Sequence, residues 1–561
     1  MHTLTFPHTS LQRMGLVLCV ALPWLNPFTS SPSTSVMPLL VSWMMAACAL
    51  LAVVDAPVIA HQGRRWMHVC GGLLGVWALS LVLMVPEVVD HGLTMGLIAS
   101  LTCIALMWAV GRRVVVSRGW AAWAVGAVLL AAVVSAVLGV LQYLDLTQSL
   151  SPWVNQPFKG DAFANLRQRN QFASLTSIGL VAVLGWQAMS TVQHSRAQRV
   201  GVWFMLNLLA AGVACSVSRT GALQWVLVAV LCAVWAWRHG QRYLCWTALA
   251  VPLLVVLWSV LMPWAATLTT GKLGASMILR VAGQAQDYGV CGSRSVLWSN
   301  VLTMIAQKPW LGWGWGETDY AHFITAYSGT RFCDILDNAH DFPLHLALEF
   351  GVPFAVAVVS WMAVWLWRQQ PWREASPLRL IAWGWLLVVG VHSVLEYPLW
   401  YGPFQMTVGL ALGMVWAKPD ERTVQPSTEH SQLVWMVLAC ILFMGCLYAA
   451  WDFKRVGQIY KAPIGRDAVY ADDPLGHAKQ SWLFQNQAEF AELSLQVTTP
   501  GNAQQVYALA QRMMHYSPEP RVVQRVIEAA EVLDVDVEKT AVLRARLDEV
   551  KRGEAAKLRQ P

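Results

Sequence analysis

Charged residues are scarce in this chain: they make up 13% of its 561 residues, whereas hydrophobic residues make up 56%. Soluble domains carry about 25% charged residues, so the scarcity excludes an ordinary soluble globule and indicates an integral membrane protein. The formal net charge of +7 does not indicate nucleic-acid binding, because the segment 452–561 carries fifteen basic and fifteen acidic residues, which cancel. We therefore expect a lipid bilayer, and no nucleic acid, as the surroundings of most of the chain.

Three sequence patterns are missing from the chain. Two of these absences each argue against a class of membrane protein. The ten-residue segments of alternating polarity that a β-barrel requires do not occur. No internal repeat or pair of matching interrupted helices indicates the inverted halves of a transporter. The first apolar segment lacks a small-residue cleavage pattern, so we interpret it as a retained span and not as a signal peptide.

Long apolar runs fill the first 450 residues. About 20 apolar residues in a helix cross the ~30 Å hydrocarbon core, and helices are required because lipid offers no partner to a free backbone group. The sequence predicts an all-α polytopic membrane protein with about thirteen transmembrane helices, near residues 14–29, 37–58, 67–86, 92–110, 119–141, 172–190, 200–216, 221–237, 244–262, 342–367, 380–398, 402–417 and 433–451.

Basic residues alternate between successive connections and so predict an orientation. If the N-terminus is cytoplasmic, the connections on that side carry fifteen basic residues and three acidic ones. The positive-inside rule then places the C-terminus outside, after an odd number of spans. We assign residues 1–451 to a transmembrane domain with a large outer loop at 263–341.

The segment 452–561 is predicted to form a separate outer-side domain. Apolar residues with helical spacing occur near 476–494, 502–516, 519–533 and 537–557. Such helices could stack as hairpins similar to tetratricopeptide units. The domain would either dock an acceptor protein or cap the long loop.

The segment DNAHDFPLHLALEFGVP at 337–353 is the strongest candidate for chemistry. It joins the longest polar connection to a predicted span and places His340 at the boundary between water and lipid. Histidine exchanges a proton near neutral pH, so a reaction between a lipid-borne and a water-borne substrate is indicated. Glu349 stands four residues after His345, which would place both on one helix face. A histidine at a helix start can also be purely structural.

Arginines occur in the outer connections, where the positive-inside rule does not require them. Guanidinium groups suit phosphate oxygens, so we expect an anionic ligand at the outer membrane face. The candidates are Arg167 and Arg169 in NLRQRNQFASL, Arg219 in CSVSRTGAL and Arg294 in GSRSVLW. Each has a structural alternative: Asn170 could cap the next helix, Arg219 could reach lipid headgroups, and Arg294 could open an interfacial helix.

The turn HSVLEYPLWYGPF at 392–404 supplies two further polar residues. His392 and Glu396 lie four residues apart, before Pro398 ends the helix. A carboxylate at membrane depth is costly without a partner. We therefore expect Glu396 to pair with an outer-face arginine or histidine, as a scaffold or as a binding contact.

Nine of the eleven cysteines lie in or beside apolar spans, where cysteine acts as a small hydrophobic residue. Only Cys291 and Cys333 lie in the long outer loop. In an oxidising compartment they could form a disulfide. The alternative is two unpaired thiols.

Five motifs, in order, resemble a known family. QRNQFA at 168–173, SRTGAL at 218–223, the pair SRSVLW and PWLGWGWG between 293 and 316, NAHDFPLHLALEFG at 338–351 and HSVLEYPLWYGPF are similar to motifs of the PglL-type bacterial protein O-oligosaccharyltransferases. These belong to the O-antigen ligase and polymerase (Wzy_C) superfamily. The usual His-Asn order reads His340-Asp341 here, which puts a side-chain amide role at position 341 in question.

The resemblance implies a GT-C-like membrane fold and transfer of an oligosaccharide from undecaprenyl diphosphate to a hydroxyl group, at the periplasmic face of a bacterial inner membrane. Direct in-line attack would invert the anomeric centre. The expected roles are catalysis by His340 and Arg219, binding of the donor diphosphate by Arg167, Arg169 and Arg294, and support by Glu349, His392 and Glu396. No cofactor or obligatory metal is expected, because the outer connections hold no dense carboxylate cluster.

Three functions remain, and the first two differ in the molecule that accepts the glycan. A protein acceptor, expected to be a type IV pilin glycosylated on Ser or Thr, is favoured by the resemblance of the 392–401 turn and by the C-terminal domain. The second function is the same chemistry on a glycan acceptor, as an O-antigen ligase or polymerase. A transporter of lipid-linked glycan is third.

Overall fold

The computed structural model describes residues 10–28, 36–59, 65–84, 90–157, 162–189, 195–278, 291–416 and 424–558. In these ranges the regular secondary structure is helical, apart from two short strands. These are β1 (Val58–Ile59) and β2 (Val424–Gln425), which pair antiparallel. Ten of the described helices are long and apolar enough to cross a membrane. The prediction of an all-helical, polytopic membrane protein is confirmed.

Each of the thirteen predicted spans contains a helix. The ten membrane-length helices are α2 (Val36–Val53), α4 (His91–Val114), α5 (Arg118–Tyr143), α6 (Arg169–Met189), α7 (Arg196–Cys215), α8 (Arg219–Arg238), α9 (Arg242–Thr270), α14 (Val352–Gln369), α15 (Pro377–Leu395) and α17 (Glu429–Val456). The other predicted spans hold α1 (Ser10–Leu25), α3 (Arg65–Met84) and α16 (Gly402–Trp416). Residues 29, 85–86, 190 and 417 of the predicted spans lie outside the described residues, and the number of thirteen crossings stays a prediction.

One predicted span, 342–367, is wrong as a single helix. The chain forms α13 (Phe342–Phe350) and then α14, and the two are separated by Gly351. Gly351 has a φ of 86°, and a Cβ atom there would lie 2.2 Å from the carbonyl oxygen of Trp310. The N–H of Val352 donates to the oxygen of Pro309 at 2.8 Å. The helix is therefore interrupted because another segment of the loop packs against it, which local sequence patterns do not encode.

The described residues form two compact units. The first comprises the described residues within 1–63, 99–286 and 367–446, and the second comprises those within 64–98, 287–366 and 447–561. The predicted boundary after residue 451 lies inside α17, and the division into two domains there stays a prediction.

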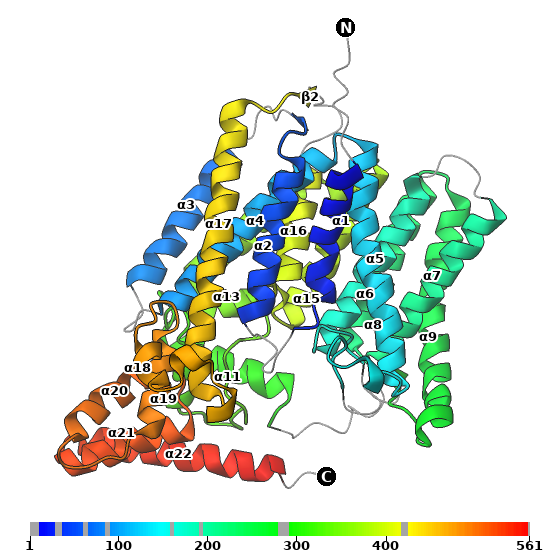
Figure 1. Ribbon diagram of the computed structural model, residues 1–561. Helices are drawn as coiled ribbons and strands as arrows, with labels where there is room; N and C mark the ends of the chain where they lie inside the picture. The colour runs from blue at the N-terminus through cyan, green and yellow to red at the C-terminus, as the bar shows by residue number, and fades with distance from the viewer. Residues whose placement is uncertain are drawn as a thin grey trace. The chain divides into compact units, whose positions relative to one another are not determined.

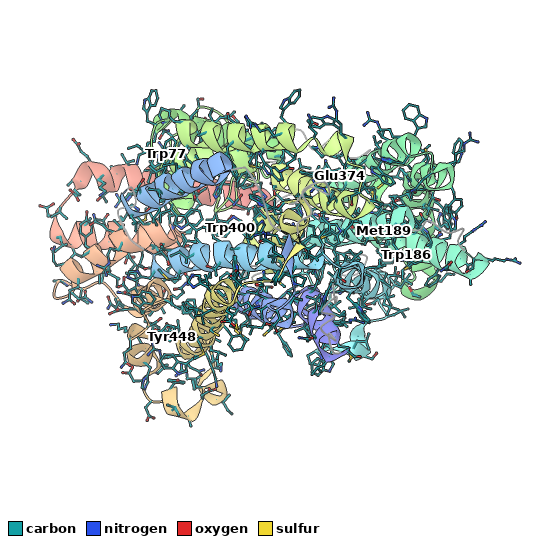
Figure 2. All side chains as sticks on the ribbon, turned by 90° about the horizontal axis from the view of Figure 1, so that it is seen from above. Trp77, Trp186, Met189, Glu374, Trp400 and Tyr448 are labelled. Carbon is teal, nitrogen blue, oxygen red and sulfur yellow. A yellow bond between two sulfur atoms is a disulfide. The ribbon has the colours of Figure 1, made fainter. Side chains whose placement is uncertain are left out.

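Helix α6 is the centre of the first unit. It packs against α5, α7, α8 and α15, and 89% of its most apolar stretch is buried. Small residues allow these close contacts: a Cβ on Gly179 would lie 2.5 Å from Cβ of Ala132, and one on Gly185 would lie 2.1 Å from the Ile381 side chain. Helices α7 and α9 run side by side (Figure 1). Trp186 and Met189, labelled in Figure 2, lie in the last turn of α6, opposite the end that carries Arg169.

The second unit joins part of the long loop to the C-terminal helices. Its loop helices are α11 (Arg294–Gln307) and α12 (Thr318–Ile324), and its C-terminal helices are α18 (Pro474–Lys479), α19 (Gln485–Leu495), α20 (Ala503–Tyr516), α21 (Pro520–Leu533) and α22 (Val537–Leu558). Residues of α19 to α22, among them Val506 and Ile527, share one hydrophobic core with Phe323 of α12. The C-terminal helices therefore pack directly on the loop that precedes His340.

Short 3₁₀ turns connect several of these elements. They are η1 (Gln148–Leu150), η2 (Pro371–Arg373), η3 (Pro398–Trp400), η5 (Gly457–Tyr460), η6 (Pro463–Gly465) and η7 (Ala468–Tyr470). Residues 279–290 of the predicted outer loop and residues 559–561 of the predicted C-terminal domain lie outside the described residues.

Candidate active site

The candidate residues fall into two groups, one in each compact unit. The first unit holds Arg167, Arg169, Arg219, His392 and Glu396, and the second holds Arg294, His340, Glu349 and the cysteine pair Cys291 and Cys333. Each group is described by itself. That the two groups meet at one site stays a prediction.

Arg169 and Arg219 are the first residues of the neighbouring helices α6 and α8, and both are exposed. Ser218 caps α8, because its Oγ accepts the N–H of Gly221 at 3.1 Å, and the same Oγ donates to Oδ1 of Asn170 at 2.7 Å. Asn170 thus bridges α6 and α8, while Oε1 of Gln168 accepts the N–H of Gln171 near the start of α6. Arg169 immediately precedes Asn170, and Arg219 immediately follows Ser218. Because Asn170 and Ser218 are hydrogen-bonded to each other, the backbones of the two arginines are close in space.

Glu396 extends the same contacts to a third helix. It is the residue after α15 and is 9% exposed. Its Oε1 accepts a hydrogen bond from Nδ2 of Asn170 at 3.2 Å. One partner of this carboxylate is therefore an amide, whereas the sequence predicted an arginine or histidine.

His392 belongs to a second layer of polar contacts between the same three helices. Its Nδ1 lies 2.9 Å from Oγ of Ser174, which accepts a hydrogen bond from Nε2 of Gln224 at 2.9 Å. Oγ of Ser177 donates to Oε1 of Gln224 at 3.0 Å. We call Asn170, Ser174, Ser177, Ser218, Gln224, His392 and Glu396 the polar seam. Mutual hydrogen bonds make this polarity tolerable inside an apolar bundle.

Sequence analysis missed the polar seam, apart from His392 and Glu396. A signal was present, because Asn170, Ser174 and Ser177 are spaced along one face of α6 within an otherwise apolar run. Their partners on α8 and α15 were not identifiable, since the rotation of each helix depends on packing. The seam connects the arginine-bearing end of the unit with its interior.

Three residues with left-handed backbone conformation lie at or beside candidate residues. Arg167, Val217 and His340 have φ angles of 57°, 52° and 51°. A positive φ is uncommon in residues other than glycine, and such conformations cluster at functional sites. Five other described non-glycine residues share this conformation, so the choice of these three segments stays a prediction.

His340 lies immediately before α13 and is held from both sides. Its backbone N–H donates to Oδ1 of Asn338 at 2.8 Å. The next residue, Asp341, caps α13 by accepting the N–H of Leu344 at 2.9 Å. A carboxylate oxygen can cap a helix as an amide oxygen does. Aspartate at position 341 is therefore compatible with the conformation of His340.

Glu349 and His345 are a buried pair on α13, as their spacing predicts. Oε2 of Glu349 lies 3.6 Å from Nε2 of His345, and Oε1 of Glu349 accepts hydrogen bonds from Thr318 Oγ1 at 2.9 Å and from the Gly316 N–H at 3.2 Å. Helix α13 lies outside the ten membrane-length helices. Burial raises the pKa of Glu349 to about 8 and lowers the pKa of His345 to about 4. Both side chains are therefore mainly neutral near pH 7.

The PWLGWGWG motif binds the C-terminal end of α13. The N–H groups of Trp313 and Gly314 donate to the carbonyl oxygens of Leu348 and Glu349 at 2.9 and 3.0 Å. A Cβ on Gly312, whose φ is 73°, would lie 2.4 Å from the Glu349 carbonyl. Glycine is needed here because the loop backbone directly contacts the helix end. The motif thus satisfies carbonyls that the end of α13 leaves open.

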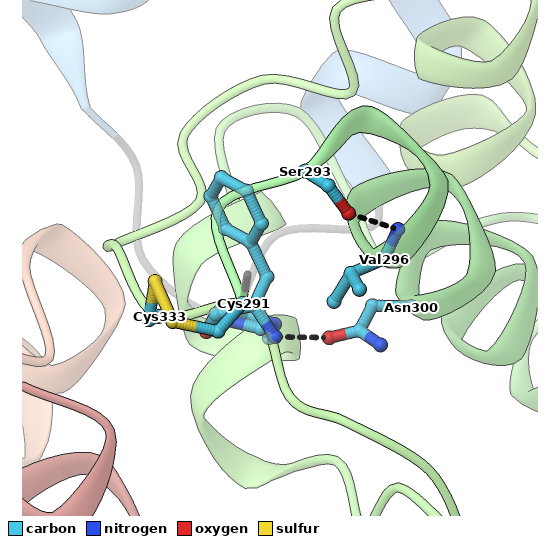
Figure 3. Close-up of a disulfide and its surroundings, with 7 residues drawn as sticks. Cys291, Ser293, Val296, Asn300 and Cys333 are labelled. Atoms are coloured by element: carbon cyan, nitrogen blue, oxygen red, sulfur yellow. Dashed lines mark hydrogen bonds between the residues drawn. A yellow bond between two sulfur atoms is a disulfide. The ribbon is translucent and has the colours of Figure 1, made fainter. Parts of the chain in front are cut away.

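Arg294 is the first residue of α11, next to the candidate disulfide. Ser293 caps this helix by accepting the Val296 N–H at 3.4 Å (Figure 3). Cys291 and Cys333 are joined by a disulfide, with their Cα atoms 5.3 Å apart. Nearby, Oδ1 of Asn300 accepts the N–H of Phe332 at 2.8 Å. The start of α11 is therefore tied to the segment that leads to His340.

The loop contains a buried histidine that sequence analysis did not single out. Nδ1 of His322 lies 2.8 Å from the Tyr327 hydroxyl, and its Nε2 lies 3.3 Å from the Phe332 oxygen. Burial, together with the nearby Arg331 guanidinium, lowers the pKa of His322 to about 3. Arg331 donates to the His322 carbonyl at 2.7 Å. Both residues therefore stabilise the loop.

Three protein families match parts of the chain. The family described as "Protein glycosylation ligase" matches residues 162–186, "O-Antigen ligase" matches residues 204–359, and "Virulence factor membrane-bound polymerase, C-terminal" matches residues 380–547. Together the matched regions contain every candidate residue selected from the sequence. The three matches therefore cover all the segments from which the candidates were chosen.

Two proteins of Acinetobacter baylyi are similar to the chain. A "General O-oligosaccharyltransferase" is 23% identical over 343 residues, which is 58% of this chain and 56% of that protein. A "ComP-specific O-oligosaccharyltransferase" is 25% identical over 176 residues, which is 30% of this chain and 31% of that protein. The chain thus spans about half the length of the first relative and about a third of the second. The family matches and these similarities support the resemblance of the chain to the PglL-type O-oligosaccharyltransferases of the O-antigen ligase superfamily.

Proposed function

We propose that this chain transfers an oligosaccharide from undecaprenyl diphosphate to a Ser or Thr hydroxyl of a periplasmic protein, with a type IV pilin as the expected acceptor. The names of both relatives support O-linked transfer of an oligosaccharide, and the match to the family described as "Protein glycosylation ligase" supports a protein acceptor. The proposal includes about thirteen membrane crossings in a GT-C-like arrangement. It also places the N-terminus in the cytoplasm, and the site and the C-terminus at the periplasmic face of a bacterial inner membrane.

The pair of exposed arginines above the polar seam is the observation that carries this proposal. Arg169 and Arg219 begin two helices that the Asn170–Ser218 hydrogen bond holds together. Two guanidinium groups at one end of a bundle suit a diphosphate, which gains negative charge as the sugar–oxygen bond breaks. Preorganised cations stabilise that developing charge more than the ground state. Arg219 is assigned this role first, with Arg167, Arg169 and Arg294 as supporting contacts.

His340 is proposed to handle the acceptor hydroxyl. The hydroxyl oxygen forms a bond to the anomeric carbon while the bond from that carbon to the diphosphate oxygen breaks. The hydroxyl proton passes to the His340 imidazole, and undecaprenyl diphosphate leaves. In-line attack inverts the anomeric centre. The backbone from which the imidazole extends is held by Asn338 on one side and by the Asp341 cap on the other, which supports this assignment.

No step in this mechanism requires a metal ion or a cofactor, and we propose that transfer is metal-independent. The guanidinium groups supply the positive charge that a metal would otherwise provide. Sustained transfer in the presence of EDTA would agree with this proposal.

The alternative is the same transfer to a glycan acceptor. It is favoured by the matches to the "O-Antigen ligase" and "membrane-bound polymerase" families. The C-terminal helices would favour a protein acceptor over a glycan acceptor if they dock that protein. Their shared core with Phe323 of α12 supports the other interpretation, a cap on the long loop.

Reconstitution with a lipid-linked oligosaccharide tests the proposal. The purified protein is given a pilin or lipid A-core as acceptor, and glycan transfer is measured by mass spectrometry. We expect glycan on pilin Ser or Thr. Glycan only on lipid A-core would establish the alternative instead.

Variants of the same protein test the site. His340→Ala should lower transfer by about 10² to 10⁴-fold, the usual contribution of general base catalysis. Arg219→Ala should lower it by about 10² to 10³-fold, as for the loss of one stabilising donor. Lys272→Ala is the control for both variants, because Lys272 is an exposed cation of the predicted outer loop 263–341 and is not one of the candidate residues. Full activity of either site variant would contradict that assignment.

A further inference from the structure

A groove at the beginning of α7 and α9 lies apart from the candidate active site. It lies between one face of α7, over residues 196–207, and Tyr243 of α9, and its volume is about 500 Å³. Both helices are long and apolar enough to cross a membrane. Arg196 and Tyr243 lie in their first turns, so the mouth of the groove lies near a membrane surface. The groove extends ~16 Å along α7, about half of the hydrocarbon core.

The mouth of the groove is cationic. Arg196 and Arg199 line it, both are exposed, and among the described lining residues there is no carboxylate. The Arg199 guanidinium carbon lies 5.7 Å from the centre of the Tyr243 ring. A guanidinium next to an aromatic ring is partly preorganised. The charge at the mouth is therefore complementary to a phosphate group.

The deeper part of the groove is apolar and suits a hydrocarbon chain. Phe204 and Val200 contribute exposed apolar side chains. The polar atoms beside them are already bonded to protein: Trp203 Nε1 donates to the Tyr243 hydroxyl at 3.2 Å. Deeper still, Oδ1 of Asn207 accepts from Trp258 Nε1 at 3.1 Å, and its Nδ2 donates to the Trp203 carbonyl at 2.8 Å. The groove thus changes from cationic at its mouth to apolar with depth. This order complements a phospholipid, in which an anionic phosphate is followed by hydrocarbon chains.

Part of the backbone at the start of α7 is already hydrogen-bonded within the helix. Ser195 and Gln198 form a capping box, in which Ser195 Oγ accepts the Gln198 N–H at 3.2 Å and Gln198 Oε1 accepts the Ser195 N–H at 2.9 Å. We assign the main phosphate contacts to the arginine side chains, which line the groove. Basic pockets between membrane helices are known to hold anionic lipid headgroups.

We propose that this groove binds one anionic phospholipid, with its phosphate at Arg196 and Arg199 and an acyl chain along Val200 and Phe204. The positive-inside pattern assigns this end of the helices to the cytoplasmic leaflet. The lipid is distinct from the undecaprenyl donor, whose proposed contacts are at the ends of α6 and α8 on the opposite side.

The test uses the full-length protein, purified in detergent and depleted of lipid. Native mass spectrometry measures binding of phosphatidylglycerol and, separately, of phosphatidylcholine of equal chain length. Phosphatidylglycerol should bind more tightly. Arg199→Gln should weaken its binding about fivefold, and the double variant with Arg196→Gln about 25-fold, since each arginine contributes about 1 kcal/mol near an anionic headgroup. Both arginines are exposed, so the variants should fold.

Arg242→Gln is the matched control. Arg242 is exposed and is the first residue of α9, at the same end of the bundle, but it does not line the groove. Its substitution should leave lipid binding unchanged. Equal weakening by Arg242→Gln and Arg199→Gln would overturn the proposal and indicate general surface charge. An absence of preference for phosphatidylglycerol, or unchanged binding by the double variant, would also overturn it.

Discussion

Substitution of Glu349 by Gln or by Ala distinguishes two electrostatic states of the buried pair on α13. Because burial raises the pKa of Glu349 to about 8 and lowers that of His345 to about 4, the pair is mainly neutral near pH 7. Glu349 then acts as a hydrogen-bond acceptor for Thr318 and the Gly316 N–H. In the other state, an ionised Glu349 would form a salt bridge with a protonated His345.

The two substitutions differ in whether a hydrogen-bond acceptor remains for Thr318 and the Gly316 N–H. Ala removes the acceptor of two donors, and each unpaired buried donor costs about 1–3 kcal/mol, so the local structure should lose about 2–6 kcal/mol in total. Gln retains the Oε1 acceptor and is uncharged, so it should cost less than about 1 kcal/mol if the pair is already neutral. If the pair were a salt bridge, Gln would leave a buried histidine charge and cost about 3–5 kcal/mol.

Hydrogen exchange of the loop is the suitable assay, since it reports local opening. In Glu349→Ala, a peptide covering residues 312–319 should exchange at least about 30-fold faster, which corresponds to about 2 kcal/mol. In Glu349→Gln the same peptide should exchange at most about fivefold faster. Equally fast exchange in both variants would refute the neutral pair.

The pH dependence gives a second readout of the same pair. A raised pKa means that Glu349 stabilises the fold fully below its ordinary pKa of 4.5, and that this contribution is lost as the pH rises through about 8. The lowered pKa values of His345 and His322 act in the opposite sense: their contribution is present above 6.5 and is lost as the pH falls toward 4 and 3. As the pH rises from 6.5 to 8, the ionisation of Glu349 should therefore lower the free energy of unfolding by roughly 1.5 kcal/mol. Asp319, whose pKa burial also raises, acts in the same sense, so the difference between the parent and Glu349→Gln isolates Glu349.

Two further predictions concern the loop around the site. Gly351→Ala should destabilise the α13–α14 junction by at least about 1 kcal/mol, because of its positive φ and the nearby Trp310 carbonyl. Gly445→Ala, where a Cβ meets nothing within 4 Å, is the control, and similar thermal unfolding of both variants would contradict this reasoning. Joint Cys291→Ser and Cys333→Ser substitution should destabilise the closed loop by about 4 kcal/mol for a separation of 42 residues, and limited proteolysis should then cut it faster. Cys440→Ser is the control, since Cys440 is free, and unchanged proteolysis of the double variant would count against a stabilising role of the disulfide.

Most of the helices could be predicted from local patterns, whereas the break at Gly351 could not. An apolar run such as that of α8 is visible because lipid requires about 20 apolar residues in sequence. The sequence of α13 and α14 is also a continuous apolar run, so it was predicted as one helix. The chain separates them because Pro309 and Trp310, forty residues earlier, contact the junction.

The candidate residues show the same division between local and distant information. The pairing of His345 with Glu349 was predictable, since residues four apart in a helix share a face. The contacts of Glu349 with Thr318 and Gly316 were not, because they join segments about thirty residues apart. The motif PWLGWGWG was visible in the sequence, but the contact of Gly312 with the end of α13 required the tertiary structure.

The sequence by itself determined that the chain is a polytopic membrane protein, where most spans lie, and which family its motifs resemble. These properties depend on composition, on runs of about 20 residues and on short motifs, all of which are local. Only the tertiary structure decided that Asn170, Ser218 and Glu396 share hydrogen bonds, that the C-terminal helices pack on α12, and that α7 and α9 form a groove. Such contacts depend on the rotation and packing of helices far apart in sequence, which no local pattern specifies.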